Sequence, residues 1–227
     1  MKIFKSILLA LLLGSSLSLV AQTGSYDTVS RPKSYPDKVN AFNADPVKKG
    51  DIVFLGNSIT AGGDWKTLLS LPNAKNRGIG GDVTFGVLER LDEVIKGQPA
   101  KVFILIGIND LARRIPKEVI HRNHKAIVNR IREGSKKTKI YFYTLLPTNS
   151  TFDKAKNHYG KDNQIAWLNA EIKKFGAIKN VKVVDLYAHF VDADQRLKAE
   201  LTYDGLHLNA EGYKSWAKML QDSGYLK

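Results

Sequence analysis

The stretch Asp51-Ile52-Val53-Phe54-Leu55-Gly56-Asn57-Ser58-Ile59-Thr60 combines an apolar run with a turn of small and polar residues. Consecutive apolar residues from Ile52 to Leu55 are typical of a strand buried on both faces of a parallel sheet. Ser58 follows the carboxyl end of that strand, where open α/β sheets bind their ligands. Ser58 is therefore a candidate nucleophile, and the alternative that it only caps the following helix remains open.

Four further segments have the composition of strands, and segments with helical periodicity separate them. The strand-like segments are Ala74 to Ile79, Val102 to Ile106, Lys139 to Leu146 and Val181 to Leu186. Apolar residues spaced three and four apart predict helices over Val83 to Ile95, Ile115 to Gly134, Ile165 to Phe175 and Tyr213 to Leu220. This alternation predicts an α/β fold of the three-layer α/β/α, flavodoxin-like type, with a five-stranded parallel sheet and right-handed crossovers.

The first fifty residues differ in composition from the rest of the chain. Lys2 and Lys5 precede an apolar run and then small residues up to Ala21, an order that predicts a secretory signal peptide over residues 1–21. Residues 22–49 contain three prolines and form an expected lead-in segment, with a short helix around Lys38 to Ala44. Residues 50–227 form the main domain. We therefore expect an exported protein, periplasmic or extracellular.

Composition narrows the classes of partner and chemistry. No segment approaches the roughly 20 apolar residues of a spanning helix, so we expect no stable membrane anchor. The chain has no cysteine, which excludes disulfides, thiol catalysis and cysteine-ligated metals. The net charge of +13 is concentrated between Arg113 and Lys139. Because no aromatic residues are interleaved there, we interpret this run as a solvated helix face and expect no nucleic-acid binding. The charge favours acidic partners, such as acidic glycans or a membrane surface.

Several other residues could bind ligands. His124 falls on the apolar face of a predicted helix and is expected in the core. His121 lies three residues before it, but a metal pair would lack a third ligand, so we expect no metal site and no cofactor. His158 and Tyr159 belong to a long polar loop after the fourth strand and are expected to face the substrate. The tryptophans are expected in the core: Trp65, Trp167 and Trp216.

Four short motifs follow predicted strands or precede the last helix. They are Gly56-Asn57-Ser58, Gly80-Gly81-Asp82, Gly107-Ile108-Asn109-Asp110 and Asp204-Gly205-Leu206-His207. In order and spacing they resemble the four sequence blocks of the SGNH, or GDSL-like, hydrolases. Over residues 50–222 the chain is similar to the branch that includes platelet-activating-factor acetylhydrolase catalytic subunits and secreted bacterial carbohydrate acetylesterases. One departure is Asn57, where the family usually has aspartate. Asparagine keeps the size and hydrogen bonding of that position but not its charge.

The chemistry of ester hydrolysis explains why these residue types are needed. A serine nucleophile requires a base, and His207 is the only histidine in a matching motif. Asp204, three residues earlier, can hold the other imidazole nitrogen and stabilise the imidazolium. The resemblance further implies an oxyanion hole formed by the amides of Ser58 and Gly81 and by the side chain of Asn109. Gly81 suits this role because it lacks a Cβ.

Each of these motifs also has a purely structural interpretation. Asp204 before Gly205 could be an ordinary turn residue, and Asp82 or the pair Asn109-Asp110 could cap a helix. The α/β-hydrolase nucleophile elbow is not supported, because Thr60 occupies the position where that motif needs glycine.

Together the motifs predict an exported serine esterase with catalytic residues Ser58, His207 and Asp204. The polar wall Thr148 to Asp162 favours a short acyl group, most simply acetyl, on a carbohydrate. Three alternatives remain open: a lysophospholipase or thioesterase for longer acyl chains, acyl transfer to another sugar, and a glycan-binding module that has lost catalysis.

Overall fold

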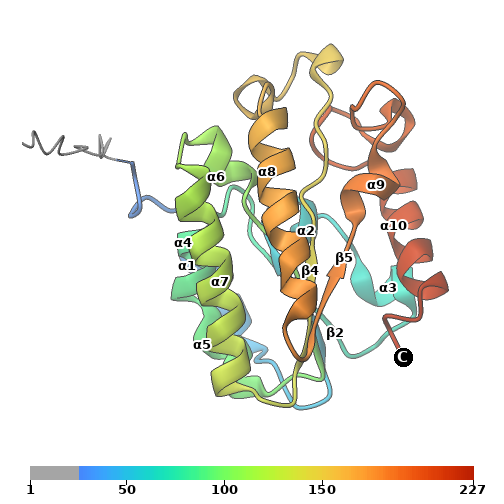
Figure 1. Cartoon of the computed structure of the whole chain (residues 1–227). Coiled ribbons are helices and arrows are strands. Elements are labelled where there is room, and N and C mark those ends of the chain that lie inside the picture. Colours follow the sequence, from blue (N-terminus) through green and yellow to red (C-terminus); the bar gives the residue numbers. More distant parts are fainter. Residues whose placement is uncertain (1–25) are drawn as a thin grey trace, which may run out of the picture.

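The computed structural model describes residues 26–227, which form an all-parallel sheet enclosed by helices (Figure 1). The strands are β1 (Ile52–Gly56), β2 (Ala74–Gly78), β3 (Lys101–Leu105), β4 (Lys139–Tyr143) and β5 (Val181–Val184). Their order is β2-β1-β3-β4-β5, and every neighbouring pair is parallel. The predicted five-stranded parallel sheet is confirmed. The signal peptide predicted for residues 1–21 lies outside the described residues.

Helices cover both faces of the sheet, as the predicted three-layer fold requires. The longer ones are α1 (Tyr35–Ala44), α7 (Lys117–Gly134), α8 (Asp162–Lys173) and α10 (Ala210–Asp222). The shorter ones are α2 (Ser58–Ala61), α3 (Trp65–Leu69), α4 (Thr84–Glu89), α5 (Leu91–Gly97), α6 (Ile108–Ala112) and α9 (Leu186–Phe190). Helices α4, α5, α7 and α8 pack on one face, and α3 and α10 pack together on the other (Figure 1).

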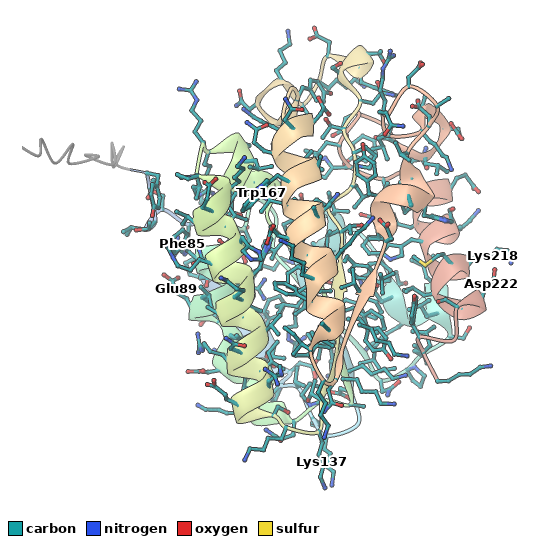
Figure 2. The ribbon with its side chains drawn as sticks, in the orientation of Figure 1. Phe85, Glu89, Lys137, Trp167, Lys218 and Asp222 are labelled. Atoms are coloured by element: carbon teal, nitrogen blue, oxygen red, sulfur yellow. The ribbon has the colours of Figure 1, made fainter. Side chains whose placement is uncertain are left out.

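An aromatic layer between the sheet and helices α3 and α10 fixes the strand that precedes Ser58. The ring of Phe54 on β1 stacks on Trp65 at 4.4 Å and on Phe103 at 5.0 Å, and Trp65 meets the edge of Trp216 at 4.8 Å. Such ring pairs contribute about 0.5–1.5 kcal/mol each beyond burial. Trp65 and Trp216 are in the core, as predicted. Trp167 on α8 is only partly buried (Figure 2).

Strand β4 ends at Tyr143, three residues before the predicted end at Leu146. Beyond Tyr143, the side chain of Asn169 takes the place of a neighbouring strand as the hydrogen-bond partner of the backbone. Asn169 of α8 accepts a hydrogen bond from the N–H of Leu145 at 2.7 Å and donates to the carbonyl of the same residue at 3.0 Å. Both backbone groups of Leu145 are therefore satisfied outside the sheet. Strand β5 also ends early, since Asp185 turns the chain into α9 by accepting from the N–H of Ala188.

The helix predicted over Val83 to Ile95 is interrupted at Arg90, which separates α4 from α5. Arg90 is buried, and its guanidinium donates to the Asp82 carboxylate and to the carbonyl of Gly56, both at 3.0 Å. Asp82 is thus part of a buried ion pair. Its position had suggested a cap for α4, but its side chain does not cap that helix. The N–H of Thr84, at the start of α4, instead donates to the carboxyl of Asp110.

The lead-in segment contains the expected helix, which begins three residues earlier than predicted. This helix, α1, packs against α4 and α5: the Tyr35 hydroxyl donates to the carbonyl of Gly86 at 2.7 Å. At the end of the segment, the N–H of Val47 donates to Glu93 on α5 at 2.7 Å. Within residues 26–227, no helix has both the length and the apolar content needed to span a membrane.

Candidate active site

Ser58 lies in the first turn of α2, immediately beyond the buried end of β1. The N-cap of α2 is Asn57, whose Oδ1 accepts a hydrogen bond from the N–H of Ile59 at 3.0 Å. The capping role considered for Ser58 therefore belongs to Asn57, and asparagine fills it without the charge of an aspartate. The Ser58 hydroxyl is left for another partner.

That partner is His207, which connects Ser58 to Asp204 in one hydrogen-bonded chain. The Ser58 Oγ lies 2.8 Å from His207 Nε2, and His207 Nδ1 lies 2.7 Å from Asp204 Oδ2. An ionised carboxylate can only accept, so Nδ1 carries the proton and Nε2 is free to accept the serine proton. The structure thus brings Ser58 together with His207, which lies 149 positions later in the chain, and with Asp204, which lies three residues before His207.

The Asp204 carboxylate is held by its own turn. Its Oδ1 accepts from the N–H groups of Leu206 at 3.0 Å and His207 at 2.7 Å. Burial raises the pKa of Asp204, but the hydrogen bonds from His207 and Leu206 outweigh it and lower the pKa below its ordinary value. Asp204 therefore stays ionised beside the imidazole, which is the state that stabilises an imidazolium.

The turn also requires glycine at position 205. Gly205 has φ +79°, and a Cβ there would lie 2.1 Å from the carbonyl oxygen of Asn149. The Gly205 carbonyl accepts from the N–H of Asn149 at 2.8 Å. Nearby, the Tyr159 hydroxyl donates to the carbonyl of Asp204 at 2.6 Å. The loop after β4 therefore fixes the turn that carries Asp204 and His207.

Two backbone amides at the carboxyl edge of the sheet have no acceptor among the described residues. They belong to Ser58, at the start of α2, and to Gly81, between β2 and α4. Gly81 has φ +73°, which favours glycine, and its carbonyl accepts from the Arg113 guanidinium at 3.0 Å. Both N–H groups are therefore available to a ligand.

Asn109 is the third predicted donor, and it is a residue of α6 rather than the cap of that helix. Its Nδ2 donates to the carbonyl of Asp82 at 2.9 Å, which leaves one N–H of the amide for a ligand. Its Oδ1 lies 2.9 Å from Nε2 of His158. His158 and Tyr159, which we expected to face the substrate, thus bond to Asn109 and Asp204.

Behind Asn109 lies a fully buried polar group on α6. The Asp110 carboxyl accepts from the Thr84 hydroxyl at 2.5 Å and from the Thr84 N–H, and Asn123 of α7 donates to the same hydroxyl at 2.8 Å. No ion pair reaches Asp110 within the described part of the chain. Burial raises its pKa to about 7.

The two histidines of α7 do not form a metal site. His124 is fully buried, and its Nε2 lies 3.0 Å from the carbonyl of Ile106, so this nitrogen carries the proton. Burial lowers the pKa of His124 to about 3. His121 faces away, toward Glu171 on α8 at 3.6 Å. Residues 26–227 contain no group of three histidine, aspartate or glutamate side chains placed to bind a metal ion.

Sequence reasoning did not identify the residues that hold the loops of the site in place. Arg113 fixes the Gly81 carbonyl, and Arg90 joins the end of β1 to the loop that carries Asp82. Arg113 was instead assigned to a solvated helix face. Tyr203 was also missed: its ring is 55% exposed and lies parallel to the imidazole of His207, with 5.9 Å between centroids. The signal for Tyr203 was its position directly before the Asp204 motif.

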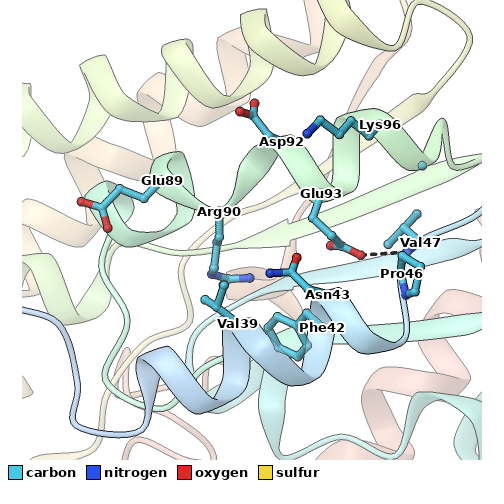
Figure 3. Close-up of a pocket in the computed structure, with 11 residues that line it drawn as sticks. Val39, Phe42, Asn43, Pro46, Val47, Glu89, Arg90, Asp92, Glu93 and Lys96 are labelled. Carbon is cyan, nitrogen blue, oxygen red and sulfur yellow. Dashed lines mark hydrogen bonds between the residues drawn. The ribbon is translucent and has the colours of Figure 1, made fainter.

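A pocket of about 400 Å³ lies between α1 and α5 (Figure 3). None of the predicted site residues line it. Its buried polar groups already have partners: Glu93 accepts from the N–H of Val47 and from Arg77, and Arg90 is paired with Asp82. This pocket is therefore separate from the constellation around Ser58.

Comparisons with known proteins agree with the fold. The model of the GDSL-like Lipase/Acylhydrolase family matches residues 54–215. The platelet-activating factor acetylhydrolase IB subunit alpha2 of Homo sapiens is 29% identical over 181 residues, which cover 77% of this chain and 76% of that protein. A solved structure from Streptococcus pneumonia, described as a candidate platelet activating factor, is 29% identical with a TM-score of 0.75, covering 84% of this chain and 91% of that one. A candidate acylhydrolase from Bacteroides fragilis is 27% identical with a TM-score of 0.72, covering 86% and 97%.

The family match and the acetylhydrolase relatives identify this protein as a carboxylic ester hydrolase. The chain belongs to the GDSL-like lipase/acylhydrolase family, also called SGNH hydrolases.

Proposed function

We propose that this hydrolase is an exported esterase that removes short acyl groups, above all acetyl, from carbohydrates. Ser58 is the nucleophile, His207 the general base and acid, and Asp204 the carboxylate that orients the imidazole. The amides of Ser58 and Gly81 and the side chain of Asn109 form the oxyanion hole. The observation that carries the assignment is the continuous hydrogen-bonded chain from Ser58 through His207 to Asp204.

The reaction proceeds through an acyl-enzyme. Ser58 Oγ bonds to the ester carbonyl carbon while its proton passes to His207 Nε2, and the negative charge on the carbonyl oxygen is met by the three donors. Collapse of this intermediate breaks the bond to the alcohol oxygen, which takes the proton from His207. Water then repeats the sequence on the acyl-enzyme and releases the carboxylic acid and free Ser58.

The size of the acyl group is inferred from the residues near the nucleophile. Those that follow Ser58 and β2 are small, namely Ala61, Gly62, Gly63, Gly80 and Gly81, and the loop after Pro147 is polar. Selectivity for long chains accumulates at about 0.8 kcal/mol per buried methylene and needs a long apolar channel. The named activity of the acetylhydrolase relatives also supports acetyl.

The alcohol side is inferred from the groups at the rim of the site. Tyr203 offers an exposed ring beside the His207 imidazole, and apolar faces of sugars can pack on such a ring. Around it lie the polar residues of the loop Thr148 to Asp162, including Lys154, whose Nζ donates to the Tyr203 carbonyl. The excess of positive charge on the chain favours an acidic glycan. Export is inferred from the pattern of residues 1–21.

The alternatives make different demands on the site. A lysophospholipase or thioesterase would need an apolar channel for a long acyl chain, whereas the residues after Ser58 are small and the loop Thr148 to Asp162 is polar. A glycan-binding module without catalysis would have no use for the Ser58, His207 and Asp204 chain. Acyl transfer to a second sugar would use the same acyl-enzyme and differ only in the acceptor that replaces water.

The test of acyl size is kcat/KM for acetyl, butyryl, octanoyl and palmitoyl esters of one alcohol, with Ser58→Ala as the blank. We expect the acetyl ester to be the best substrate and the value to fall as the chain lengthens. A preference that rises toward octanoyl or palmitoyl would replace this proposal with the lipid alternative.

The test of the alcohol uses Tyr203→Ala, assayed on an acetylated oligosaccharide and on an aryl acetate. We expect KM for the oligosaccharide to rise several-fold and KM for the aryl ester to stay within twofold. Val29→Ala is the matched control, because Val29 is also a large, exposed apolar residue but lies in the lead-in segment. Equal effects of Tyr203→Ala on both substrates would contradict a role in sugar binding. Acetate release from an acetylated glycan panel then identifies the natural alcohol.

A further inference from the structure

His158 is a histidine in the site that the proposed reaction does not use. It ends the single turn Lys156–His158, which packs against α6, and its side chain is half-buried. Its Nε2 lies 2.9 Å from Oδ1 of Asn109, the only side-chain donor of the proposed oxyanion hole. A contact of this kind can control how the Asn109 amide is oriented.

The hydrogen bonds at Asn109 determine which way its amide faces. The Asp82 carbonyl can only accept, so the atom 2.9 Å from it is the amide nitrogen of Asn109. The amide oxygen therefore faces His158, and His158 Nε2 must carry a proton to donate to it. The last torsion of an asparagine side chain is broad and does not fix the amide by itself. The amide is thus held at both ends, with one N–H left over.

The turn that carries His158 is itself anchored to the other half of the site. The Tyr159 hydroxyl accepts from the N–H of Ala155 at 3.0 Å and donates to the carbonyl of Asp204 at 2.6 Å. One short segment therefore contacts both the carboxylate residue of the triad and the oxyanion donor. These hydrogen bonds hold the segment in place, so that the oxyanion donor is positioned before charge develops on the substrate.

We propose that His158 is a positioning residue, which donates a hydrogen bond to Asn109 and so keeps an amide N–H directed at the oxyanion. This inference rests on the proposed function of Asn109. His158 acts through Asn109 and need not touch the substrate. Burial and the neighbouring His207 lower the pKa of His158, although Asp204 and the backbone of Ala155 oppose this, and the net shift favours the neutral imidazole.

The kinetic test compares His158→Ala and His158→Gln on an aryl acetate. We expect His158→Ala to lower kcat about tenfold with KM within twofold, a smaller loss than the 10²–10³ expected for removing the donor itself. His158→Gln should recover most of the rate, because its amide N–H can reach the same place. His189→Ala is the matched control: His189 is also half-buried but bonds to Ser215, remote from the triad, and should leave kcat unchanged.

A double-mutant cycle separates positioning from direct action. In the Asn109→Ala background, His158→Ala should cause no further loss, because there is no amide left to orient. Multiplicative losses, or a rise in KM with kcat unchanged, would overturn the proposal and assign His158 to the substrate. Either result would overturn the role of His158 but not the assignment of Ser58 as the nucleophile. Failure of the proposed function itself would appear as turnover that survives Ser58→Ala.

A readout that is independent of turnover is the NMR signal of the Asn109 side-chain amide, assigned by its absence in Asn109→Ala. We expect both N–H resonances to shift in His158→Ala and to return toward their original positions in His158→Gln. Unchanged resonances in His158→Ala would refute the contact, whatever the natural substrate is.

Discussion

Two pairs of titratable residues in this protein differ in their exposure and in their hydrogen-bond partners. At the carboxyl edge of the sheet, His207 and Asp204 are partly exposed, with 27% and 14% of their side-chain surface accessible, and each has a charge-compatible partner. On α6 and α7, Asp110 and His124 are fully buried, and each bonds only to neutral groups.

A shifted pKa does not by itself mark a catalytic group. Burial raises the pKa of Asp110 to about 7 and lowers that of His124 to about 3, so both are neutral at pH 5. Asp204, in contrast, is kept ionised by hydrogen bonds. In the proposed mechanism His207 of the outer group exchanges protons with the substrate, whereas Asp110 and His124 of the inner group affect the pH dependence of stability.

The largest effect is expected for Ser58→Ala. Removing the nucleophile should lower kcat on the order of 10⁵-fold or more, as it does in other serine hydrolases. The midpoint of thermal unfolding should stay within a few degrees, because only a hydroxyl at the sheet edge is lost. Ser34→Ala, an exposed serine of the lead-in, is the control. Unchanged esterase rates would contradict the assignment.

The second effect concerns the oxyanion donor. Asn109→Ala should lower kcat about 10²- to 10³-fold, because this amide acts only when charge develops on the carbonyl oxygen. KM should change little. Steady-state kinetics on an aryl acetate measure both constants. An effect confined to KM would mean that Asn109 binds the substrate.

The third prediction concerns the inner group and is read from stability against pH. The unfolded values are 3.8 for Asp110 and 6.5 for His124. Between pH 4 and 6.5 the native protein holds a proton on Asp110 that the unfolded chain releases, so this group makes stability fall as pH rises. His124 does the reverse, because the unfolded chain binds a proton that the native protein does not. The two slopes, each about 1.4 kcal/mol per pH unit at most, oppose one another.

A variant that lacks one of the two groups should therefore show the pH dependence of unfolding free energy that the other group causes. With Asp110→Asn, the free energy of unfolding should rise with pH between 4 and 6.5, whatever its overall offset. With His124→Gln, which can still donate to the Ile106 carbonyl, it should fall over the same range. Urea unfolding at several pH values measures both. Parallel curves for the two variants and the unaltered protein would show that these groups do not titrate as described.

The smallest effect is expected at the N-cap of α2, next to the nucleophile. Asn57→Ala removes the hydrogen bond to Ile59 and should lower the free energy of unfolding by about 1 kcal/mol. Asn57→Asp keeps an acceptor and should retain the cap. Chemical denaturation of the three proteins checks this order. Equal stability of Asn57→Ala and the unaltered protein would remove the capping role.

The sequence predicted the sheet because its signals are local. Runs such as Ile52 to Leu55 and glycines at strand ends indicate β1 and its neighbours without any knowledge of distant contacts. The same reasoning reached Ser58, which follows a recognisable strand. His207 was reached through the resemblance of its motif to the fourth block of the SGNH hydrolases.

The sequence could not predict features that depend on side chains from remote elements. Arg90 divides a periodic helix because it reaches Gly56, 34 positions away. Asn169 ends β4 from another helix, and His158 meets Asn109 across 49 positions. In each case a tertiary hydrogen bond outweighs the local pattern, so periodicity alone gives the wrong boundary or the wrong neighbour.

The buried pair of Arg90 and Asp82 restricts how this protein can diverge. Losing either residue alone strands a buried charge, at a cost of about 3–5 kcal/mol, whereas replacing both with well-packed apolar residues is often neutral. Arg90→Lys is not an intermediate, because an ammonium cannot reproduce the two directed bonds to Asp82 and the Gly56 carbonyl. Every single-step mutational path away from the pair therefore crosses an unstable intermediate, and we expect related sequences to keep both residues or to have exchanged both.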